Sequence, residues 1–215
     1  MTGLASRAIA NVQVHYMYYK LEVDYFVNPK PYETEVTGWS DELDEDDFSL
    51  GKIVDYDVDK KLEFDLVEYE DGAVGLPDMF KDEYLIMSDR LVDIFKKAGV
   101  DNFQLFPAIL KDEKRNVTLN NYMVVNIIGL IRAADMEKSE YIDMGGTGQI
   151  AVGFRNLVID ESQTGGALIF RMAESISTII IHESIKKILD ASEIKYLRYI
   201  PCIKDEDVRS NRVSQ

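Results

Sequence analysis

The chain has very little of the residue types that carry most metal and redox chemistry. Its 215 residues include one cysteine, Cys202, and two histidines, His15 and His182. A single cysteine excludes an internal disulfide and is typical of proteins from a reducing compartment. Because the two histidines lie far apart in the sequence, a zinc site built from cysteine and histidine is not expected. Cys202 follows Pro201 on an expected strand, so we predict that it is a core residue.

The sequence also lacks a long apolar run and a surplus of basic residues. No stretch approaches the roughly 18–20 apolar residues of a membrane span, and the N-terminal segment MTGLASRAIANVQVHY has no apolar core of a secretory signal. The 24 lysines and arginines stand against 39 aspartates and glutamates, which gives a formal net charge of −15. Since phosphate contacts require cations, we expect neither a nucleic acid nor a membrane as partner. The cytoplasm is the expected compartment.

The negative charge is concentrated in the first part of the chain. Residues 1–83 hold 21 acidic and 7 basic side chains, a net charge of −14, whereas residues 84–215 hold 18 and 17. An acidic surface of this kind attracts basic partners over a distance. The 46% of hydrophobic residues still allow a sizeable core. We predict an N-terminal extension over 1–16, an acidic subdomain over 17–83, a main α+β domain over 84–203 and a polar tail over 204–215.

Residues 84–107 predict a strand, a helix and a second strand, in the order YLIMSDRLVDIFKKAGVDNFQLFP. Ser88 is a good helix N-cap because its hydroxyl can accept a hydrogen bond from a backbone N–H of the first turn. Leu91 and Phe95 recur at helical spacing, and Gly99 provides a left-handed stop. The pattern predicts a helix over 88–98.

The same pattern returns 94 residues later, where His182 aligns with Ser88 and predicts the start of a second helix over 183–191. We expect the two helices to bury four side chains against a sheet, namely Leu91, Phe95, Ile185 and Leu189. An internal repeat and convergence on a common strand–helix–strand unit both explain the match. We favour two similar pieces of core.

Strand-like segments clearly outnumber these two helices. Alternating or apolar residues predict strands near 16–25, 62–67, 103–107, 122–131, 154–160, 167–172 and 197–201. The polar segment ADMEKSEYIDM predicts a turn or a short helix. We therefore predict an α+β fold with a mixed, mainly antiparallel sheet and a few packed helices.

No motif identifies a reaction. The glycine run within residues 145–153 partly matches a dinucleotide-binding loop, but that pattern needs a strand directly before it and a helix directly after it. A flexible hairpin loop explains these glycines better. Asp55, Asp57 and Asp59 have the spacing that opens a calcium loop, but Lys60 and Leu66 stand where glycine and glutamate are required. We predict no catalytic residue, no metal and no other cofactor.

An acidic loop around the only tryptophan is the candidate partner-binding site. Aromatic residues beside charged ones are typical of interaction hot spots. The candidate residues are Trp39, Asp41, Glu42, Asp44, Glu45, Asp46, Asp47 and Phe48. A solvated surface loop without a role in binding is the alternative.

Eight segments occur together in one order between residues 17 and 202: YYKLEVD, LIMSDRLVDIFKKAGVDNFQLFPAIL, YMVVNII, ADMEKSEY, FRNLVID, LIFRMAE, IIIHESIKKIL and LRYIP. In this order they resemble immunity-protein family eleven of bacterial polymorphic-toxin systems. The family usually begins near the YYKL segment, so residues 1–16 are expected to be an extension. The loop around Trp39 is richer in carboxylates than the family pattern.

The resemblance implies a non-enzymatic cytoplasmic inhibitor that binds a toxin encoded beside it. It brings no catalytic residues with it, so the candidate loop comes from the features of this sequence alone. The acidity of the loop indicates a toxin with a basic surface. An adaptor or chaperone for a secreted effector is the alternative function, and an enzyme of unrecognised chemistry is a third.

Overall fold

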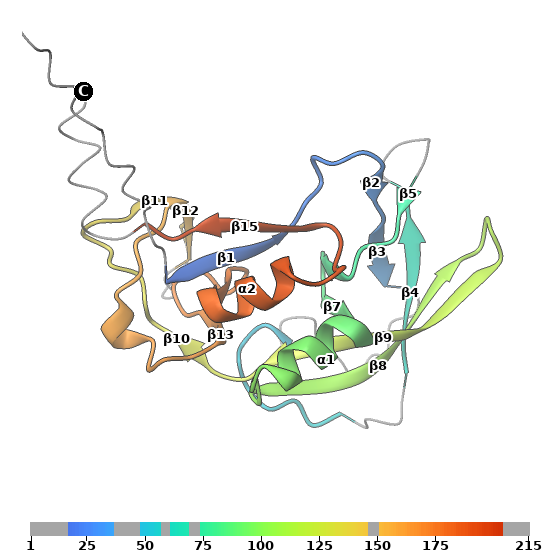
Figure 1. The fold of residues 1–215 in the computed structure, drawn as a ribbon, viewed down its shortest axis with the longest axis horizontal. Helices are drawn as coiled ribbons and strands as arrows, with labels where there is room; N and C mark the ends of the chain where they lie inside the picture. Colours follow the sequence, from blue (N-terminus) through green and yellow to red (C-terminus); the bar gives the residue numbers. More distant parts are fainter. Residues whose placement is uncertain (1–16, 37–47, 57–60, 69–73, 146–150, 204–215) are drawn as a thin grey trace, which may run out of the picture.

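The computed structural model describes residues 17–36, 48–56, 61–68, 74–145 and 151–203. Within these ranges the chain forms fifteen strands and two α-helices, with a 3₁₀ turn, η2, at Glu161–Gln163. The fold is therefore α+β and dominated by sheets, which are mixed and mostly antiparallel, as Figure 1 shows.

The larger sheet has six strands in the order β3-β4-β8-β9-β7-β6. All its neighbours are antiparallel except β4 and β8, which run parallel. Its strands are β3 (Glu33–Val36), β4 (Leu62–Val67), β6 (Met79–Lys81), β7 (Leu85–Ser88), β8 (Phe103–Asp112) and β9 (Val117–Ile127). The long β8–β9 hairpin extends beyond the rest of the sheet (Figure 1).

The smaller main sheet has five strands in the order β10-β13-β14-β1-β15. Its strands are β1 (Tyr18–Val23), β10 (Leu130–Ile131), β13 (Ile169–Met172), β14 (Ile179–His182) and β15 (Leu197–Pro201). The first strand of the described chain thus lies between two of the last ones. Two short pairs complete the sheets: parallel β2 (Lys30–Pro31) with β5 (Val74–Gly75), and antiparallel β11 (Glu140–Asp143) with β12 (Val152–Asn156).

Helix α1 spans Asp89–Lys97 and has the predicted ends. The Ser88 hydroxyl accepts a hydrogen bond from the Leu91 N–H at 3.2 Å. Gly99 follows the last turn with φ of 92°, a conformation that glycine adopts without the strain of a Cβ. The helix prediction from local spacing is confirmed.

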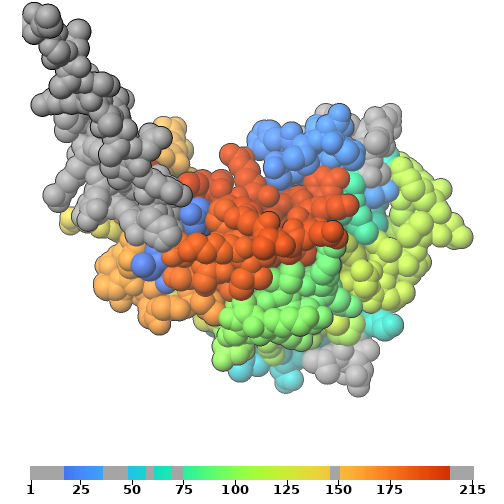
Figure 2. Space-filling view, in the orientation of Figure 1, coloured from blue at the N-terminus to red at the C-terminus, as the bar shows by residue number. Residues whose placement is uncertain are grey.

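Helix α2 spans Glu183–Asp190, and its cap is the predicted His182, whose Nδ1 accepts from the Ser184 N–H at 3.1 Å. The two helices lie next to each other on one face of the molecule (Figures 1 and 2). The four side chains predicted to be buried are at most 2% exposed: Leu91, Phe95, Ile185 and Leu189.

A single apolar core joins both helices to both main sheets. Alternate residues of a strand face opposite sides of its sheet, so Met87 and Ile181 point into this shared core while Ile86 and Ile180 point to the other side. The outer face of the larger sheet carries an aromatic cluster that includes Phe106. The two sheets are therefore parts of one packed body.

The two strand–helix–strand units share their surroundings as well as their order. In the first unit β9 lies between β7 and β8, and in the second β1 lies between β14 and β15. The starts of the corresponding strands and helices are 94 residues apart, as the sequence indicates. Packing of one helix over three antiparallel strands accounts for this likeness, so the structure agrees with two similar pieces of core and does not require a duplication.

Two parts of the sequence prediction need correction. In the segment predicted as a turn or short helix, residues 136–138 do form a turn, but Glu140–Asp143 forms strand β11. Its two apolar residues are adjacent, so no alternation marks it as a strand. The apolar run predicted as one strand over 122–131 is divided between the two sheets. The division falls at Gly129, whose φ of 91° turns the chain from β9 into β10.

Candidate interaction site

Seven of the eight candidate partner-binding residues lie outside the described residues: Trp39, Asp41, Glu42, Asp44, Glu45, Asp46 and Asp47. The eighth, Phe48, is the first described residue after them and is only 3% exposed. Its ring packs edge-to-face on Tyr84 and on Phe106, with ring centroids 5.3 Å apart in both cases. The Phe48 side chain therefore belongs to the core, and in this conformation it offers no surface to a partner.

The segment that follows Phe48 is attached to the larger sheet by polar side chains. Gln104 on β8 bonds both backbone groups of Val54, accepting from its N–H at 2.8 Å and donating to its carbonyl at 3.2 Å. Asn126 on β9 donates from Nδ2 to the Lys52 carbonyl at 2.7 Å. Asn126 is fully buried, so its amide N–H groups need such a partner. The C-terminal side of the candidate loop is thus fixed to the sheet.

A small pocket of about 160 Å³ lies where the chain re-enters the core at Phe48. Its other walls are the end of β6 at Lys81, the β6–β7 turn with Tyr84, and the β13–β14 hairpin with Arg171 and Ser177. A larger hollow of about 520 Å³ lies between Leu130, Met144 and the same β13–β14 turn. The walls of the small pocket come from three separate segments, at residues 48–49, 81–85 and 171–177, so only the fold brings them together.

Two cations line the small pocket in different electrostatic surroundings. Lys81 forms an ion pair with Glu22 at 2.8 Å. Burial lowers the pKa of Lys81, and the Glu22 carboxylate opposes that shift. Arg171 is 5% exposed and donates from Nη1 to the Ile176 carbonyl at 2.6 Å, across the turn of its own hairpin. Burial alone lowers the pKa of Arg171 to about 10, because a desolvated guanidinium favours its neutral form.

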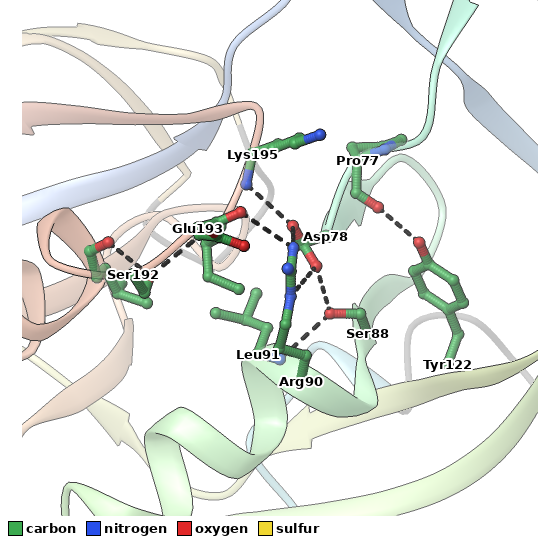
Figure 3. A network of polar contacts seen from close by, with 11 residues as sticks. Pro77, Asp78, Ser88, Arg90, Leu91, Tyr122, Ser192, Glu193 and Lys195 are labelled. Atoms are coloured by element: carbon green, nitrogen blue, oxygen red, sulfur yellow. Dashed lines mark hydrogen bonds and ion pairs between the residues drawn. The ribbon is translucent and has the colours of Figure 1, made fainter.

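A second polar cluster connects the two strand–helix–strand units (Figure 3). The Asp78 carboxylate, 6% exposed, accepts from the Ser88 hydroxyl at 2.7 Å and from both Nε and Nη2 of Arg90 at 3.3 and 2.7 Å. It also accepts from the Lys195 N–H at 2.9 Å, in the segment between α2 and β15. Arg90 Nη2 donates to the Glu193 carbonyl at 3.1 Å. These bonds hold the start of α1 against the second unit, and we assign them a structural role.

Cys202 is buried, at 4% exposure, as the sequence predicts. Burial raises the pKa of its thiol to about 12. Because the thiolate is the reactive form, we expect the folded protein to react with a disulfide reagent at pH 8 about a thousandfold more slowly than a free thiol of pKa ~8.5. Labelling in buffer and in denaturant measures the ratio. Equal rates in the two conditions would contradict a buried thiol.

These features describe a class of protein: a sheet-dominated α+β protein with small surface pockets and capped helices. Among the described residues no group of three or more histidine, cysteine, aspartate and glutamate side chains is placed to hold a metal ion. In the same part of the chain, no helix has the length and apolar character needed to cross a membrane.

The family follows from comparison with known proteins. Residues 8–204 match the model of the immunity protein family Imm11, and the chain belongs to this family. The resemblance that rests on eight sequence segments in the family's order is therefore confirmed over nearly the whole chain. No curated protein matches the chain.

Proposed function

We propose that this protein binds a cognate bacterial toxin in the cytoplasm and neutralises it by direct contact, without catalysis of its own. The observation that carries the proposal is the match to the immunity protein family over residues 8–204. An immunity protein of this kind needs a surface complementary to its toxin and no reactive groups. The concentration of negative charge in residues 1–83 supports a toxin with a basic surface.

The acidic loop remains our candidate for the binding surface, now without the Phe48 side chain. Phe48 is held in the core, so it fixes one end of the candidate segment. Trp39 is then the aromatic candidate for a buried anchor at the toxin, and the six acids between residues 41 and 47 are candidates for steering the encounter.

Two variants test this division of roles against the toxin encoded next to the gene. Replacing the six acids by their amides is expected to slow association about tenfold at low salt and to flatten its salt dependence, because salt screens charges beyond about 8–10 Å. Trp39→Ala is expected to speed dissociation about 30-fold, which corresponds to the ~2 kcal/mol of a typical hot spot. Surface-bound kinetics over a range of salt concentrations and protection of toxin-expressing cells provide the two readouts.

The matched control removes the same charge from elsewhere on the surface. Six exposed acids outside the loop are replaced by their amides: Asp93, Asp101, Glu113, Glu137, Glu140 and Glu193. If the loop is the binding surface, this control keeps most of the association rate, since nearby charges dominate steering. Unchanged rates and full protection in both loop variants would show that the toxin binds elsewhere. A toxin that binds but stays active would indicate an adaptor instead of an inhibitor.

A further inference from the structure

Arg171 is a buried cation without an anionic partner in the part of the chain that the structure describes. It lies on β13, two residues from Ile169, so its side chain leaves the sheet on the side of the shared core. Its only hydrogen bond among these residues runs from Nη1 to the Ile176 carbonyl. Nε is buried and has no partner. A buried charge of this kind is unfavourable unless it is paired.

Arg90 shows what the unused side of this guanidinium can bind. Arg90 directs Nε and Nη2, the two groups on one edge of its planar fork, to the two oxygens of the Asp78 carboxylate. Such two-point bonds are the geometry in which arginine recognises carboxylates. In Arg171 the Nη1 group is used by the hairpin turn, whereas the Nε side has no partner among the described residues. Among the described residues, the Nε edge of the guanidinium is thus bonded to a carboxylate in Arg90, whereas the Nε of Arg171 has no partner.

Two acids near the pocket, Glu22 and Asp82, already have other partners, and Glu83, which also lines it, forms no ion pair with Arg171 among the described residues. Glu22 accepts from Lys81 and pairs with Lys20. Asp82, although it lines the same pocket, accepts from the backbone and hydroxyl of Thr34. Burial lowers the pKa of Arg171, and no carboxylate of the described residues forms an ion pair with it. Lys81 adds a second positive charge beside it.

The pocket at Arg171 has room for a small group. Its volume of about 160 Å³ is below the roughly 300–1,000 Å³ of pockets for drug-sized ligands. It suits one carboxylate or one acidic side chain. Tyr84, Leu85 and Ile176 also line the pocket, and apolar walls strengthen an ionic hydrogen bond by excluding water.

We propose that the free Nε edge of Arg171 is a carboxylate-binding site that opens into this pocket. The carboxylate comes either from a free small acid or from an acidic side chain of the bound partner. The second source rests on the proposed function, whereas the site itself does not. A carboxylate bound here would pair the buried cation and join the β13–β14 hairpin to the segment after Phe48.

The test follows the Arg171 Nε–H signal by nitrogen-15 NMR in the unaltered protein. Sodium acetate is expected to move this signal downfield and saturably, while sodium chloride at the same ionic strength leaves it in place. The Arg90 Nε–H signal is an internal control, because its edge is already bonded to Asp78. An Arg171 signal that responds equally to acetate and to chloride, or to neither, overturns the proposal.

Adding the partner toxin then distinguishes the two possible sources of the carboxylate, a free small acid and an acidic side chain of the toxin. If its binding moves the same signal and abolishes the response to acetate, an acidic side chain of the toxin fills the site. If the acetate response persists in the complex, the ligand is a free carboxylate. As a second measurement, acetate is expected to raise the melting temperature of the unaltered protein and not that of Arg171→Met. An acetate response in a protein that fails to protect cells would refute the proposed function and leave the site intact.

Discussion

Replacing Phe48 by alanine is expected to lower the free energy of unfolding by about 3–5 kcal/mol, the usual loss for a fully buried phenylalanine. The ring is 3% exposed and contacts the aromatic cluster on the outer face of the larger sheet. Its truncation removes the edge-to-face contacts with Tyr84 and Phe106 and leaves a cavity between them. Urea unfolding followed by circular dichroism measures the change in midpoint.

The matched control is Phe26→Ala. Phe26 is 86% exposed, and the Arg198 guanidinium lies 5.2 Å from its ring centroid. An exposed contact of this type is worth no more than about 1 kcal/mol. The same substitution should therefore have little effect there. If Phe48→Ala unfolds at the same urea concentration as the Phe26 control, Phe48 is not a core residue, and its role as a partner anchor in the loop would need to be restored.

Removing the Asp78 carboxylate is expected to have the second largest effect, about 3 kcal/mol. Asp78→Ala leaves the Ser88 hydroxyl, the Arg90 guanidinium and the Lys195 N–H without their common acceptor. We expect less than the full penalty of breaking a buried ion pair because half of the Arg90 side chain is exposed to water. Urea unfolding measures this loss as well.

Hydrogen exchange shows whether the loss of stability in Asp78→Ala arises at the bonds that the Asp78 carboxylate accepts. The Lys195 amide should exchange faster in Asp78→Ala, whereas the amides of β9 keep the protection of the central strand. Asp190→Ala is the control, since its exposed pair with Lys186 on α2 is worth about 0.3–0.5 kcal/mol. A similar small effect of Asp78→Ala would mean that Asp78 does not connect the two units.

The helices were the most predictable part of the fold. Their starts and ends depend on side chains within about four positions of the cap, as Ser88, Gly99 and His182 show. The apolar spacing also named the four side chains that the helices bury. Strand β11 was missed because its exposed residues carry no alternation, and the 122–131 run was not divided because a single glycine separates two strands of different sheets.

The candidate site was only partly predictable. Composition and charge located the acidic loop. The order of eight segments along the chain indicated the family, which the match over residues 8–204 confirms. Charge and aromatic content cannot tell an exposed ring from a buried one, so they did not show that the Phe48 ring lies in the core. Nothing local distinguishes Arg171 from the other arginines, because its burial depends on the hairpin turn and on segments far away in the sequence.

The sequence by itself determined the class of fold, the two capped helices and the family, since these depend on local periodicity and on the order of segments along the chain. Only the tertiary structure decided that β1 lies between β14 and β15, that Phe48 enters the aromatic cluster, and that Arg171 is buried beside Lys81. The physical reason is that these contacts join residues about 35 to 180 positions apart. Their free energy depends on which surfaces the fold buries together, and local spacing does not encode that choice.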